Sequence, residues 1–146
     1  MIKFSINKSF FLQALNATKR AISSKNAIPV LSTIKIEVQN SNITLTGSNG
    51  QISIENIIPT SNENAGLLIT SPGAILLEAN FFIYIVSSLP DVTLDFEEIE
   101  HHQIVLTSGK SEITLKGKDV DLYPRLQEMA TEKLNSLKKK ELDLKN

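Results

Sequence analysis

The chain has 146 residues, no cysteine and a net charge of −1, and 41% of its residues are hydrophobic. This length fits a single domain with one core, and the lack of cysteine excludes a disulfide framework and a thiol nucleophile. The longest apolar run, Phe81 to Val86, has six residues, against about 20 in a membrane helix, and the N-terminus has no signal-peptide core. We therefore predict a cytoplasmic protein without a membrane partner.

The charge is distributed unevenly along the chain. Residues 1–60 carry six basic and two acidic side chains, a net +4, whereas residues 61–127 carry four basic and ten acidic ones, a net −6. No carboxylate side chain occurs from Met1 to Ile36. This asymmetry permits an anion-binding face on a chain that is weakly acidic overall.

Alternation of apolar and polar residues predicts mostly antiparallel sheet, with turn sequences between consecutive strands. The predicted strands are, in chain order, Ile2 to Ile6, Thr33 to Val38, Ile43 to Thr46, Gln51 to Ile57, Leu67 to Thr70, Ile75 to Leu77, Val92 to Phe96, Gln103 to Thr107 and Glu112 to Lys116. Two segments are typical of helix: Lys8 to Ser23, capped by Asn7, and Ala79 to Ser88, which ends before Pro90.

The predicted elements occur in two copies of one pattern. Ile43 to Glu55 aligns without a gap on Ile104 to Lys116 at an offset of 61 residues, and the Phe-Phe pairs of the two helices match at an offset of 71. We interpret this as an internal duplication of a strand, a helix and three strands, with repeats at about residues 1–60 and 67–118. Because one unit cannot bury its helix alone, we expect an α+β domain with two helices packed side by side on curved antiparallel sheet.

The two predicted helices differ in their exposed faces. On a helical wheel, the first has a polar face without carboxylates, formed by Gln13, Asn16, Arg20 and Ser23. Lys25 extends this face in the following loop, so the face could lie near phosphates, although a plain solvated surface explains the same residues. The second helix is apolar around nearly its whole circumference, so either the domain encloses it or a second chain covers it.

The sequence contains no arrangement typical of an enzyme or a metal site. Ser108 to Ser111 ends like a phosphate-binding loop, but position 104 is Ile where that motif requires glycine, and a hairpin is predicted there. His101 and His102 lie beside carboxylates, but no third ligand has useful spacing. We therefore predict a non-catalytic protein with no metal and no cofactor.

Several segments resemble, in order, the first domain of the bacterial DNA polymerase III beta subunit, the sliding clamp. These segments are Ala27 to Leu31, Leu45 to Glu55, Phe81 to Pro90, Ser108 to Ser111 and Gly117 to Leu126. The similarity runs from Met1 to about Gln127 and implies a DNA-clamp-like domain over residues 1–127. Residues 128–146 form a divergent charged tail, which we expect to be helical or disordered.

The resemblance implies a DNA replication accessory factor, a ring whose helices line the central hole and which tethers DNA polymerase III to duplex DNA without sequence specificity. The residues that match DNA-facing positions are Lys25 and, as weaker neighbours, Arg20, Lys19 and Lys8. The residues that match the interface with another clamp subunit, on the edge strand and the second helix, are Lys110, Ile113, Leu115, Phe81 and Phe82.

The resemblance covers one domain, whereas a clamp subunit of this family has about three, so we expect a truncated clamp. Polymerase and clamp loader are then expected partners only of the full-length family member. The alternative is an interaction fragment that does not bind DNA and pairs edge to edge with a full-length clamp or with itself. The open edge predicted at Ser111 to Lys116 and the apolar second helix favour such pairing.

Overall fold

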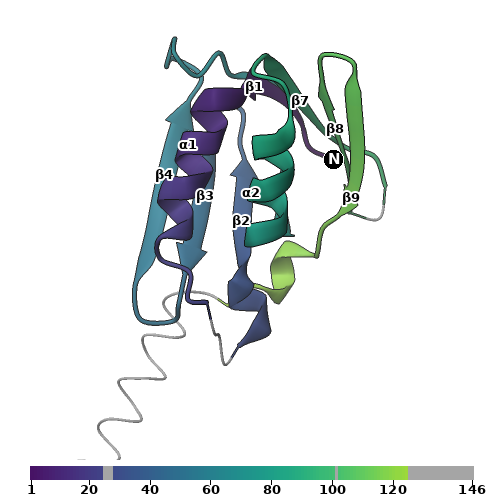
Figure 1. Cartoon of the computed structure of the whole chain (residues 1–146). Helices are drawn as coiled ribbons and strands as arrows, with labels where there is room; N and C mark the ends of the chain where they lie inside the picture. Colours follow the sequence, from purple (N-terminus) through teal and green to yellow (C-terminus); the bar gives the residue numbers. More distant parts are fainter. Residues whose placement is uncertain (25–27, 101, 125–146) are drawn as a thin grey trace, which may run out of the picture.

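The computed structural model describes residues 1–24, 28–100 and 102–124 (Figure 1). The helices are α1 (Lys8–Lys19) and α2 (Ala79–Ser88), with short 3-10 helices at Pro29–Ser32 and Val120–Leu122. The strands are β1 (Lys3–Asn7), β2 (Thr33–Val38), β3 (Asn42–Ser48), β4 (Ser53–Pro59), β5 (Leu68–Ser71), β6 (Gly73–Glu78), β7 (Thr93–Glu98), β8 (Gln103–Ser108) and β9 (Ser111–Lys116). Every predicted strand and helix is present. The predicted site residue Lys25 and the 128–146 tail lie outside the described residues.

Side-chain caps explain where the two helices begin. The Asn7 side chain accepts a hydrogen bond from the Phe10 N–H at 3.0 Å and starts α1, as predicted. The Glu78 carboxylate accepts hydrogen bonds from two N–H groups in the first turn of α2. Helix α1 ends at Lys19, four residues before the predicted end, because the N–H groups that follow bond three residues back in a tighter turn.

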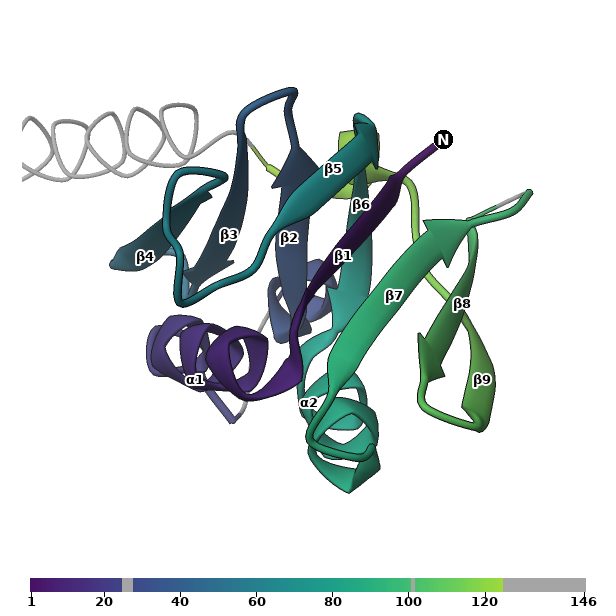
Figure 2. The same ribbon diagram turned by 90° about the horizontal axis from the view of Figure 1, so that it is seen from above.

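The strands form two antiparallel sheets, in the orders β5-β1-β7-β8-β9 and β4-β3-β2-β6. The repeated unit appears as β1-α1-β2-β3-β4 and again as β6-α2-β7-β8-β9. The first strand of each unit lies in the sheet of the other, because β1 pairs with β7 and β6 pairs with β2. The two helices lie side by side on one side of the sheets (Figures 1 and 2). The predicted α+β arrangement, with two helices side by side on antiparallel sheet, is therefore present, and the exchange of the first strands is an addition to it.

The hairpins β3-β4 and β8-β9 occupy equivalent places, but the gap-free alignment of their second strands is wrong. Gly47 faces Ile54 in the first hairpin, whereas Ser108, which matches Gly47, faces Ser111 in the second. The first hairpin is one residue pair longer and closes through loop 49–52, whereas the second closes through the two-residue turn 109–110. Strand β4 therefore matches β9 at an offset of 57 residues rather than 61.

Four phenylalanine rings join the two repeats in the core between the helices and the sheets. Phe4 of β1 stacks on Phe96 of β7 with ring centroids 4.8 Å apart. Phe11 of α1 and Phe82 of α2, which match at the offset of 71, meet edge to face at 6.1 Å. All four side chains are at most 2% exposed, and burying such a ring contributes about 1.5–3 kcal/mol. Each repeat thus depends on the other for its core.

A smaller apolar cluster of Leu31, Leu76 and Tyr123 lies on the other side of the four-stranded sheet. An antiparallel bridge between Leu76 and Lys118 holds the chain over this side. Burial raises the pKa of the Tyr123 phenol to about 12, because the charged form would lose its hydration. The Lys35 ammonium lies 5.3 Å from the centroid of the same ring. Within the described ranges, no helix combines the length and the apolar character needed to cross a membrane.

Candidate nucleic-acid face and strand edge

The exposed face of α1 is polar and contains no carboxylate. Its exposed side chains, extending into the turn after the helix, are Gln13, Asn16, Lys19, Arg20 and Ser23. Lys19 and Arg20 lie at the C-terminal end of α1, and neither forms an ion pair with another described residue. The charges of these two side chains are therefore available to an anionic ligand such as a phosphate.

Lys8 lies apart from this exposed face, so the structure does not support its predicted role in DNA binding. Its side chain is only 8% exposed, and its Nζ donates to the backbone oxygen of Ser87 at 3.5 Å. Ser87 lies in the last turn of α2, where the helix dipole places partial negative charge. Nearby, the Ser9 hydroxyl donates to the Asp91 carboxylate. Lys8 thus joins the start of α1 to the end of α2.

Helix α2 presents an apolar stripe to solvent and no charged side chain. Phe81 and Tyr84 are 54% and 68% exposed, whereas Phe82, Ile83 and Val86 are buried. Phe82 was predicted at a subunit interface, but it lies wholly in the core and has no surface to offer a partner. Tyr84 lies three residues after Phe81 and therefore on the same helix face.

Strand β9 is the edge of the five-stranded sheet, as predicted, and pairs with β8 alone among the described strands. Lys110 is exposed in the turn before it, and Ile113 is half-buried. Leu115, also predicted at the interface, is buried in the core because its side chain points toward the helices. The accessible part of this edge is therefore Lys110, Ile113 and the outward-facing side chains of β9.

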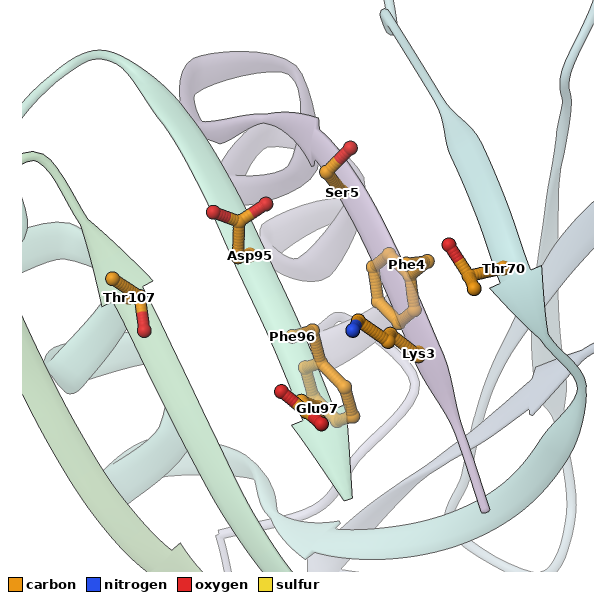
Figure 3. A pocket seen from close by; sticks show the side chains of 8 residues that line it. All are labelled: Lys3, Phe4, Ser5, Thr70, Asp95, Phe96, Glu97 and Thr107. Atoms are coloured by element: carbon orange, nitrogen blue, oxygen red, sulfur yellow. The ribbon is translucent and has the colours of Figure 1, made fainter. Parts of the chain in front are cut away.

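The outer face of the five-stranded sheet, opposite the helices, carries a polar depression of about 340 Å³ (Figure 3). It is lined by Lys3, Phe4, Ser5, Thr70, Asp95, Phe96, Glu97 and Thr107. Its two carboxylates, Asp95 and Glu97, project from β7 on the side away from the core. Carboxylates thus lie on the outer sheet, whereas α1 has none. No motif in the sequence indicates this depression, because its residues come from four strands.

The two motifs weighed in the sequence occupy hairpins. Gly109 and Lys110 form the turn between β8 and β9, so a strand and not a helix follows them. His102 has Nδ1 at 3.5 Å from the Glu98 carboxylate and Nε2 at 4.0 Å from that of Asp119. Among the described residues, no group of three or more histidines and carboxylates is placed to hold a metal ion.

Two helices side by side on two antiparallel sheets with exchanged first strands form the domain of sliding clamps. The crystal structure of the DNA polymerase III beta chain from Streptococcus pneumoniae matches with a TM-score of 0.84 and 78% identity, over 86% of this chain and 33% of that one. The beta sliding clamp of the same species is 77% identical over 130 residues, which are 89% of this chain and 34% of the clamp. That of Lactococcus lactis is 59% identical over the same shares.

The family profile described as "DNA polymerase III beta subunit, N-terminal domain" matches residues 2–127. The chain therefore belongs to this family, and the resemblance seen in the sequence is confirmed. It spans about a third of the length of the curated relatives that it matches.

Proposed function

We propose that this chain serves as the N-terminal domain of a sliding clamp, a non-catalytic, cytoplasmic replication factor that holds DNA polymerase III on duplex DNA. The observation that carries the proposal is the separation of charge between the two sides of the domain. The α1 face has Lys19 and Arg20 and no carboxylate. The outer face of the five-stranded sheet bears the carboxylates of Asp95, Glu97 and Glu112 against the ammonium groups of Lys3 and Lys116. A duplex would therefore be favoured on the α1 side over the outer sheet.

The DNA contacts we propose are weak and independent of base sequence. Lys19 and Arg20 can reach phosphates, and Lys25 stays a predicted third contact because it follows the same face in the chain. Each phosphate contact contributes about 0.9 to the slope of log affinity against log salt concentration. Two or three such weak contacts allow the domain to move along the duplex. Stable retention on DNA then requires a closed ring.

The partner we propose at the other surface is a second clamp subunit. The open β9 edge can add a strand of that subunit, with Lys110 and Ile113 beside the contact. Phe81, which is exposed on α2, stays a predicted part of this interface. Polymerase and clamp loader are proposed as partners only of a full-length clamp.

A chimeric clamp tests this function directly. Residues 2–127 of this chain replace the matching third of the Streptococcus pneumoniae clamp, and the loaded ring is followed on nicked circular and on linear duplex DNA. We expect the chimera to stay on circles, to slide off linear DNA and to support processive synthesis by DNA polymerase III.

The charge pattern is tested in the same chimera. Lys19→Glu with Arg20→Glu should lower retention on circles as the salt concentration rises, because two attractive contacts become repulsive. The control, Lys3→Glu on the outer sheet, should leave retention unchanged. Equal retention of the helix variant and the control would remove α1 from the DNA face, and a chimera that never remains on circles would refute the clamp function.

The second candidate is an interaction fragment that pairs with a clamp subunit and does not contact DNA. The exposed Phe81 and Tyr84 and the lack of any cation on α2 favour it. Capture of the intact pneumococcal clamp by this chain, with no salt-dependent binding to duplex DNA, would support this candidate over the first.

A further inference from the structure

Strand β9 is a more accessible edge than β4, its equivalent in the first repeat. At the offset of 57 residues, Thr114 of β9 matches Ile57 of β4, and Lys116 matches Pro59. Pro59 has no N–H group, so it deletes one donor from the edge of β4. Strand β9 contains no proline. It therefore offers an uninterrupted row of donors and acceptors to another strand.

The backbone of β9 points alternately toward β8 and toward the open side. Ser108 and Ser111 face each other across a two-residue turn whose glycine has a φ of 57°, as in a type II′ hairpin. These two flanking residues form a hydrogen-bonded pair, and such pairs alternate along an antiparallel ladder. The N–H and C=O groups of Glu112, Thr114 and Lys116 therefore point outward.

The side chains of β9 are complementary to those of a second, antiparallel β9. Glu112 lies two residues before Thr114 and Lys116 lies two residues after it, and all three side chains are exposed. If Thr114 faces Thr114 of a second copy, each Glu112 faces a Lys116. On the inner side, the half-buried Ile113 then faces Leu115, which already packs in the core. The stabilisation therefore comes mainly from the opposite charges directly across the ladder.

Neighbouring registers bring like charges together. A ladder centred on Ile113 places Lys116 opposite Lys110 of the second copy, and a ladder centred on Glu112 places the two Glu112 carboxylates opposite each other. Like charges directly opposite destabilise a strand pair. The charges therefore favour the register centred on Thr114 over these two. A ladder centred on Leu115 would need Lys118 opposite Glu112, and the Lys118 backbone is already paired with Leu76.

We infer that two copies of this chain pair through β9, antiparallel about a twofold axis at Thr114. The two five-stranded sheets then form one continuous sheet. The contact is closed, because the same edge is used on both copies. This inference goes beyond the proposed clamp function: the occupant of the edge is a second copy of this chain, and it competes with a clamp subunit for β9.

Single cysteines test the register, because the chain has no cysteine of its own. Directly opposite residues of a hydrogen-bonded pair have Cα atoms about 5.5 Å apart, which a disulfide can span. Thr114→Cys should therefore give a disulfide-linked dimer of twice the 16.1 kDa chain mass on mild oxidation. Glu112→Cys should not, because its two copies lie four residues apart along the ladder, about 14 Å.

The matched control is Ile57→Cys, an exposed residue at the equivalent place on β4. It reports random collisions between equally exposed thiols. Faster cross-linking at Thr114 than at Ile57 and Glu112 supports the inference. Equal rates at the three sites overturn it, and faster cross-linking at Glu112 overturns the register.

Charge exchange provides a second test that does not depend on cysteine chemistry. In sedimentation or light scattering, Glu112→Lys and Lys116→Glu should each abolish the dimer, because both place like charges opposite. A mixture of the two variants should recover a dimer of the wild-type mass, because each Lys then faces a Glu again. Recovery on mixing supports antiparallel self-pairing, and failure to recover overturns it.

Capture of the intact pneumococcal clamp by the unmodified chain separates this inference from the proposed function. Capture of the intact pneumococcal clamp by a chain that stays monomeric alone would overturn self-pairing and leave the clamp contact in place. A dimer that excludes the pneumococcal clamp would support self-pairing and count against the clamp contact.

Discussion

Replacing Lys8 with Met tests whether this lysine is structural. The substitution keeps an unbranched apolar stem of similar length but removes the ammonium that lies 3.5 Å from the Ser87 oxygen. A partly buried cation at a helix C-terminus contributes up to about 2 kcal/mol, and a hydrogen bond this long contributes at the low end of its range. We therefore expect a loss of about 1–2 kcal/mol, which lowers the Tm by about 3–6 °C for a domain of this size.

Urea unfolding followed by circular dichroism measures this loss. Lys110→Met is the control, because Lys110 is exposed in a turn and has no ion pair with another described residue. Its free energy of unfolding should change by no more than about 0.5 kcal/mol, as for an ordinary surface substitution. A Lys8→Met chain that keeps its stability but loses salt-dependent DNA binding would refute the structural role and restore Lys8 to the DNA face.

Two further predictions concern packing and ionisation. Gly117→Ala would place a Cβ 2.5 Å from Cδ1 of Ile75 and 2.9 Å from the Leu76 oxygen; we expect a loss of about 1–3 kcal/mol, and an unchanged urea midpoint would contradict this packing. Burial raises the pKa of Tyr123 from 10.0 to about 12. The folded state therefore holds the phenol proton more tightly than the unfolded state. The contribution of the protonated phenol to stability is complete below pH 10 and is lost as the pH rises toward 12. Tyr123→Phe should reduce this alkaline loss in thermal melts, and an identical loss in both chains would contradict it.

The local structure of this chain could be predicted because it depends on local rules. Strand β2 and helix α2 have the predicted ends, and Asn7 caps α1 as its side chain suggested. Partner choice could not be predicted in the same way. Alternation assigns a residue to one face of a strand but does not say which strand lies beside it, so the exchange of β1 and β6 had no signal in the pattern.

The errors at the candidate site come from contacts between distant elements, and the repeat contained a signal for two of them. Lys8 matches the buried Ala79 at the offset of 71, so its position faces the interior in both repeats. Phe82 matches Phe11, which lies opposite the polar face of the first helix on a helical wheel and is buried. The burial of Leu115 was hidden for a different reason, since the gap-free alignment matched it with Ile54 rather than with the buried Ile58.

The exchange of first strands affects how the chain acquires its structure during synthesis. The sheet built from β2, β3 and β4 lacks its β6 edge until residue 78 has been made, and β1 waits for β7, which ends at residue 98. Neither repeat can therefore complete its sheet and core when it first leaves the ribosome. The long sequence separation of these pairings slows folding, since the intervening chain must be closed before the contacts form. The domain is thus expected to fold as one cooperative unit, only after its last strands have been synthesised, with no stable half-domain on the way.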